Sequence, residues 1–232
     1  MNEVGLSIIE CLRNVAAERE LRARDPALAE RVAAVKQFQH ARFARTYADL
    51  LADARYAKAA AFFLEDLYGP ADFTERDGQF LRVVPALVRL FPKDILATVS
   101  ELGALHALSE RLDTSMAKAL PHPRPDGLGY AQAWRTVGEA PARERQIALM
   151  VAVGSALDRY TRNALLRQTL RVMRGPAQAA GLGALQQFLE RGFDTFRGMG
   201  GAQEFLATIS RRERALAALL FDGGEPAQGA AL

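Results

Sequence analysis

Strong helix formers dominate this chain along its whole length. Its 232 residues include 43 alanines and 26 arginines, and Leu, Glu and Gln are also common. These residues favour helix over strand. The Asp-Gly steps at 77–78, 126–127 and 222–223 do not lie between alternating β-like runs, so the sequence lacks a hairpin signal. We therefore predict an all-α fold, a compact bundle of about eight to ten helices.

Several boundaries of these helices follow from local signals. Asp25-Pro26 combines an N-cap residue with proline at the first helical position, so a helix is expected from there to about Leu51. Another is predicted from Lys93 to about Leu120. A third is predicted from Ala140 to about residue 174, where Gly175-Pro176 would end it.

Two other local patterns concern packing and capping. Gly154 lies within the apolar run 147–156, which indicates a central helix closely approached by a neighbour. Thr74-x-x-Asp77 resembles a capping box, with Asp in place of the usual Glu or Gln. Pro85 should kink the helix that follows or start a new turn.

A proline-rich segment divides the chain into two parts. Three prolines fall within residues 121–125 and exclude a helix there. We expect residues 121–129 to be a connection within a single helical domain, 1–221, because the helices on both sides are strongly apolar. A linker between two domains is the alternative. Residues 222–232 are rich in Gly, Pro and Ala, and we expect a disordered tail.

Composition and motifs narrow the possible functions. The single cysteine, Cys11, excludes an internal disulfide framework, and no run of about 18 apolar residues predicts a transmembrane segment. A net charge of +3 argues only weakly for an anionic partner, and nucleic acid is unlikely. No Walker loop, dinucleotide-binding, zinc-protease or nucleophile-elbow motif occurs, and no helix carries a Glu-x-x-His pair. We expect no metal and no cofactor.

The predicted helix 93–120 carries the first candidate site. His106, Glu110 and Asp113 are spaced i, i+4 and i+7, within about 60° of one another around the helix. His106 and Asp113 fall on a face that otherwise carries aliphatic residues. We predict that these three residues bind a ligand and that a carboxylate orients the histidine ring. The alternative is a core histidine with a hydrogen-bonded neighbour, or a polar edge of the helix.

Three arginines form the second candidate site. Arg167, Arg171 and Arg174 are also spaced i, i+4 and i+7, so they share one face of a continuous helix. Such a stripe could face phosphate, acidic lipid or nucleic acid. Aromatic residues do not interleave with it, which argues against RNA. The alternative is a solvated face whose arginines favour a helix C-terminus.

Several segments together resemble a known family. They are 46–50 (TYADL), 62–70 (FFLEDLYGP), 72–73 with 76–77, 105–108 with 112–113, 192–196 and 200–202. They are similar to a family of uncharacterised proteobacterial proteins named for an FFLEELY-type motif, with Asp66 at the second Glu of that name. The resemblance implies a bacterial, cytoplasmic, helical protein, and it supplies no catalytic residues.

Two functions remain open at this point. The first is a non-enzymatic helical protein that binds a partner or acts in regulation, with a homo-oligomer as one form of such binding. The second is a binder of small molecules or an enzyme, with an apolar ligand or tetrapyrrole near His106. An enclosed cavity lined by His106 would favour the second, and an exposed apolar patch on a packed core would favour the first.

Overall fold

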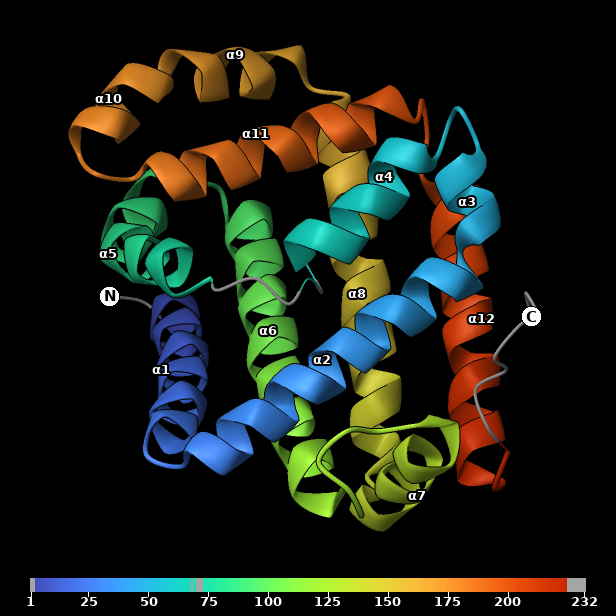
Figure 1. Ribbon diagram of the computed structural model, residues 1–232. Helices are drawn as coiled ribbons and strands as arrows, with labels where there is room; N and C mark the ends of the chain where they lie inside the picture. The colour runs from blue at the N-terminus through green and yellow to red at the C-terminus, as the bar shows by residue number, and fades with distance from the viewer. Residues whose placement is uncertain (1–2, 68, 70–72, 225–232) are drawn as a thin grey trace.

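The computed structural model describes residues 3–67, 69 and 73–224 of the chain. These residues contain twelve α-helices, one π-helical turn and no strand, so the predicted all-α class is confirmed (Figure 1). The elements are α1 (Glu3–Ala23), α2 (Pro26–Thr46), α3 (Ala48–Ala52), α4 (Ala57–Phe62), η1 (Phe63–Leu67), α5 (Thr74–Leu90), α6 (Lys93–Ala119), α7 (Gly127–Val137), α8 (Ala140–Thr161), α9 (Ala164–Val172), α10 (Arg174–Ala179), α11 (Gly183–Gly198) and α12 (Gln203–Phe221). Three of the twelve, α3, α4 and α10, have six residues or fewer.

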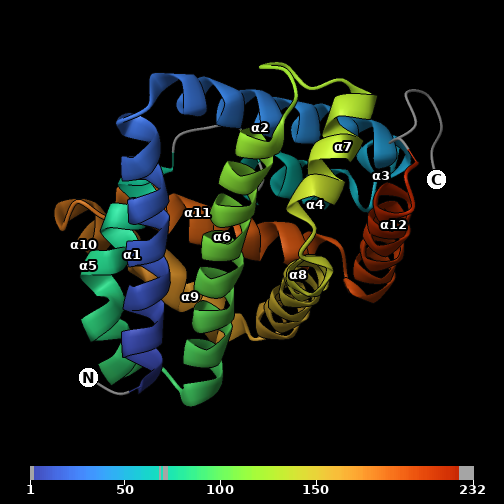
Figure 2. The same ribbon diagram turned by 90° about the horizontal axis from the view of Figure 1, so that it is seen from below.

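The longest helix, α6, lies at the centre of the fold. It packs against α1, α2, α7 and α8, and Figure 2 shows it running between α1 and α8. Its neighbours come from both sides of the proline-rich connection. The largest apolar cluster lies beside it, and its fully buried aromatic residues include Tyr47, Phe63, Phe196 and Phe205. Polar side chains on α6 can therefore contact several other helices.

The predicted close approach at Gly154 is confirmed. A Cβ atom at this position would lie 2.6 Å from Cδ2 of Leu206, which belongs to α12. Only a residue without a side chain leaves room for that leucine, so α8 and α12 pack closely here.

Two predicted helix boundaries are wrong, and each error has a local cause. α2 ends at Thr46, because the chain turns at the buried Tyr47 before α3. The helix expected to run from 140 to 174 divides into α8 and α9, where the side chain of Asn163 accepts a hydrogen bond from the backbone N–H of Leu165 and starts a new helix. α5, by contrast, continues through Pro85 without a break.

The proline-rich connection is shorter than the predicted 121–129. α7 begins at Gly127, since the side chain of Asp126 accepts a hydrogen bond from the backbone N–H of Gly129 and caps the helix. α12 ends at Phe221, and residues 225–232 of the predicted tail lie outside the described residues.

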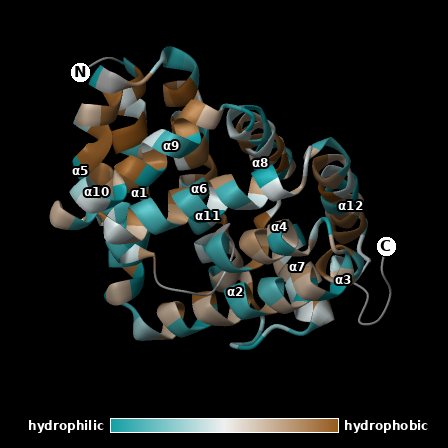
Figure 3. Cartoon of the chain, turned by 90° about the horizontal axis from the view of Figure 1, so that it is seen from above, coloured by the Kyte–Doolittle hydropathy of each residue, from teal (hydrophilic) through white to brown (hydrophobic). Residues whose placement is uncertain are grey.

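The hydropathy of the helices was compared with that of membrane-spanning segments. In the part of the chain that the structure describes, no helix combines the length and the apolar character needed to span a membrane. Figure 3 shows α9, α10 and α11 on the face seen from above.

Candidate functional site

The three predicted site residues on α6 point to different partners. His106 contacts Asp77 of α5, whereas Glu110 contacts Arg22 of α1, and Asp113 contacts Gln39 of α2. The carboxylate that holds the histidine ring is therefore Asp77 and not Glu110. The physical reason is that Arg22 and Lys36 bind Glu110 instead.

Asp77 forms a charged cluster with His106. Nε2 of His106 donates a 2.7 Å hydrogen bond to Oδ2 of Asp77, and Nη2 of Arg19 donates to the same oxygen at 2.7 Å. Nε of Arg76 donates to Oδ1 at 3.2 Å. Burial alone would raise the pKa of Asp77, but the hydrogen bond from His106 and the charges of His106, Arg76 and Arg19 outweigh it and lower the pKa to about 2. Asp77 is therefore a carboxylate at neutral pH.

Glu110 lies in a second cluster, one helical turn further along α6. It is buried, and Nη1 of Arg22 and Nζ of Lys36 donate to its two carboxylate oxygens at 2.5 and 2.7 Å. The Arg22 guanidinium also donates to the backbone carbonyl of Glu110 and to the hydroxyl of Thr114. Burial raises the pKa of Glu110, but the charges and hydrogen bonds of Lys36 and Arg22 lower it to about 2. The cluster ties α1 and α2 to α6.

Asp113 has a different environment, although it is only three residues away. Its Oδ1 accepts a 3.1 Å hydrogen bond from Nε2 of Gln39. Burial raises the pKa of Asp113, and the nearby positive charge of Lys36 only partly offsets this. Arg143 is also buried, and its guanidinium carbon lies 3.8 Å from the centre of the Trp134 ring. Glu110 and Asp113 thus have pKa values shifted in opposite directions.

The sequence pattern did not identify the partners of these groups. Arg19 and Arg22 lie on α1, Lys36 lies on α2, and Asp77 falls in the segment interpreted as a capping box. In the structure the N-cap of α5 is Phe73, and Asp77 faces inward. The capping-box prediction for Asp77 is therefore wrong, and the sequence carried no other signal for this residue. The arginines also lack a signal in a chain with 26 of them.

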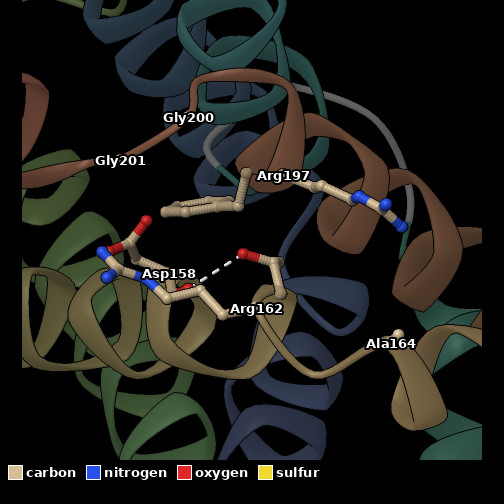
Figure 4. Close-up of a pocket in the computed structure, with 8 residues that line it drawn as sticks. Asp158, Arg162, Ala164, Arg197, Gly200 and Gly201 are labelled. Carbon is tan, nitrogen blue, oxygen red and sulfur yellow. Dashed lines mark hydrogen bonds and ion pairs between the residues drawn. The ribbon is translucent and has the colours of Figure 1, made fainter.

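A surface pocket of about 370 Å³ lies where the end of α8, the start of α9, the end of α11 and the turn before α12 meet. Asp158 lies on its wall and accepts hydrogen bonds from the backbone N–H of Ala202 and from Arg162. Figure 4 shows the Arg197 side chain directed away from Asp158. His106 does not line this pocket. The described residues contain no group of three or more His, Cys, Asp or Glu side chains arranged to hold a metal ion.

The three predicted arginines do not form one continuous stripe. Arg167 and Arg171 lie on α9, but Arg174 begins α10 after the chain turns at Met173. Arg167 pairs with Asp194 of α11 at 2.9 Å, and Arg174 pairs with Glu190 of α11 at 2.5 Å. These two ion pairs attach α9 and α10 to α11.

α9 is the most unusual helix of the structure in its burial. None of its residues is buried, although it contains several large apolar side chains. Leu165 is 69% exposed and Val172 is 68% exposed, and Met173 directly after the helix is 47% exposed. Figure 1 shows α9 and α10 as an outer layer against α11.

The FFLEDLYGP segment mainly supplies core residues. Phe62, Phe63 and Leu64 are buried at the junction of α4 and η1. Glu65 contacts His40 at 3.3 Å and Asp66 forms an ion pair with Arg191, so the acidic residues of the motif bind the neighbouring helices α2 and α11. Residues 68 and 70 lie outside the described part of the chain.

Gly69 has a steric reason to be glycine. A Cβ atom there would lie 2.2 Å from the backbone oxygen of Glu65, which no residue with a side chain could accommodate without a backbone shift. The described residues of the motif thus contribute mainly to packing.

Comparison with known proteins gives one result. Neither the curated proteins nor the solved structures include a match to this chain. A family model matches residues 18–227, which cover nearly all of the helices described above. The chain belongs to the family described as Domain of unknown function (DUF8198).

Proposed function

We propose that this protein is a non-enzymatic binding protein, and that α9 and α10 form its binding surface. The observation that carries this proposal is the exposure of Leu165, Val172 and Met173 on an outer helix. Contiguous exposed apolar side chains with a charged surround are typical of interaction sites. The polar groups of α6, in contrast, already have partners within the fold.

The apolar face of α9 is only half covered. At about 100° per residue, its apolar side chains from Leu165 to Met173 span an arc of about 160°. α11 lies against one edge of this arc, where Leu166 and Leu170 are partly buried. The other edge, with Leu165 and Val172, remains in solvent. An amphipathic helix normally buries its whole apolar face, so this edge is available for a partner.

We also propose a source, a cellular location and a domain organisation for the protein. We infer that it is bacterial and cytoplasmic, and that its family is the one with the FFLEELY-type motif, which is supported by the family match and by the FFLEDLYGP segment. The packing of α6 on helices from both sides of the proline-rich connection supports a single domain. Cell fractionation of the producing organism tests the location.

Site-specific photocrosslinking tests the binding function. Benzoylphenylalanine in place of Val172 should crosslink in the producing cells to a discrete species, either protein, lipid or a second copy of the chain. The control places the same group at Leu128 of α7, which is 62% exposed. A discrete adduct at 172 and none at 128 would support the proposal. Equal patterns at both positions would refute it.

A further inference from the structure

The segment of the chain that contains the exposed apolar residues also carries an excess of positive charge. Residues 158–198 contain seven arginines and three acids, a net charge of +4, whereas the whole chain has a net charge of +3. The rest of the chain therefore has a net charge of −1. Residues 159–189 contain five arginines and neither Asp nor Glu. The partner of this surface should be anionic.

The shape of this surface favours a flat partner over a helix. The space between α9 and α11 measures only about 10 Å³ and is closed by Leu170, Phe193 and the two ion pairs. A partner helix usually docks in an apolar groove, and this space is too small to act as one. Leu165 and Val172 are instead exposed on α9, which Figure 1 shows in an outer layer of the fold.

We propose that α9 and α10 bind the surface of an anionic lipid bilayer. This inference rests on the proposed binding function and names its partner. Leu165, Val172 and Met173 would enter the boundary between headgroups and acyl chains, as in other interfacial amphipathic helices. Arg171, which is exposed on α9, would face lipid phosphates.

Vesicle sedimentation of the purified full chain tests this proposal. We expect binding to vesicles of mixed phosphatidylglycerol and phosphatidylcholine, little binding to phosphatidylcholine alone, and a decrease with added salt because headgroup attraction is screened. The double variant Leu165→Ser/Val172→Ser should bind at least tenfold more weakly. Each substitution removes an aliphatic side chain that the bilayer would bury. Arg171→Glu should also weaken binding to the anionic vesicles.

Matched controls keep the test specific. Leu128→Ser removes an equally exposed leucine on α7, and Arg145→Glu reverses an exposed charge in the first half of α8. Both should bind as the unchanged protein does. Helical circular dichroism should be the same for all variants, because none of the substituted side chains is buried.

Two outcomes would overturn the lipid proposal. One is a lack of binding to anionic vesicles, and the other is binding that the α9 substitutions and the controls reduce equally. A protein adduct from position 172 in cells, without vesicle binding, would leave the binding function intact and replace the bilayer with an acidic protein. The absence of both an adduct and vesicle binding would remove both proposals.

Discussion

Nε2 of His106 lies 2.7 Å from Oδ2 of Asp77, and this contact links α6 to α5. The same carboxylate also binds Arg19 of α1, so three helices meet at one buried acid. Asp77 is thus the centre of the cluster, and His106 is one of several donors to it.

His106→Ala should destabilise the protein moderately. Asp77 keeps Arg19 and Arg76 as partners, so we expect the free energy of unfolding to fall by about 1–3 kcal/mol. Asp77→Ala should cost more, since it removes the acceptor of all three donors. Urea denaturation followed by circular dichroism measures both. A His106→Ala variant as stable as the unchanged protein would show that the contact contributes nothing.

Stability should decline steeply in acid. The pKa values of Asp77 and Glu110 are each lowered to about 2, from ordinary values of 3.8 and 4.5. Because the folded-state pKa lies below the unfolded one, the unfolded chain takes up these protons first as the pH falls. The stabilisation is complete above about pH 5 and is lost towards pH 2, by about 2–3 kcal/mol per group.

Urea denaturation at pH 6, 5, 4 and 3 measures this decline. Glu110→Gln should reduce the slope between pH 5 and 3, since one of the two titrating groups is then missing. An unchanged slope in that variant would argue against the lowered pKa of Glu110.

Glu110→Ala should be among the most destabilising single substitutions in α6. It leaves Arg22 buried and Lys36 largely buried without their carboxylate, and breaking a buried ion pair from one side costs about 3–5 kcal/mol. Glu144→Ala serves as the comparison, because Glu144 pairs with Arg214 at the surface, where the cost should stay below about 1 kcal/mol. Similar losses in the two variants would contradict the burial argument.

Two glycines in helices should respond to alanine in opposite ways. At Gly154 of α8 the added Cβ would meet Leu206 at 2.6 Å, so Gly154→Ala should cost about 1–3 kcal/mol through overpacking. At Gly78 of α5 nothing lies within 4 Å, and Gly78→Ala should stabilise the protein by about 0.5–1 kcal/mol. Thermal melting of both variants distinguishes them by the direction of the change. Two changes of the same sign would contradict this explanation.

Several features decided by neighbours in sequence were predicted correctly. Asp25 caps α2 with Pro26 at its first position, as the dipeptide indicated, because capping is a contact between residues three apart. Gly154 indicated a close helix contact because glycine, which has no side chain, lets a neighbouring helix approach an apolar helix closely. The all-α class followed from propensity summed over long segments.

Features decided by distant segments were not predictable in this way. The spacing of His106 and Glu110 correctly placed both on α6, but the choice of partner depended on Arg19, Arg22 and Lys36, which lie far away in sequence. The break between Thr161 and Ala164 is different, because it has a local cause: Asn163 is a typical N-cap residue, and the prediction of one continuous helix gave it no weight. Ion pairing across helices depends on the packed fold, and periodicity does not encode it.

The attachment of α9 and α10 has a thermodynamic consequence. Of the residues in these two helices only Ala177 is buried, and contacts with α11, with the end of α8 and with each other hold them in place. This layer should open locally at a much lower free energy than global unfolding, and its amide hydrogens should exchange with solvent faster than those of α6. A partner bound to the exposed edge of α9 would slow the exchange of the amide hydrogens from Leu165 to Val172. Their exchange rates would therefore indicate whether a partner is bound.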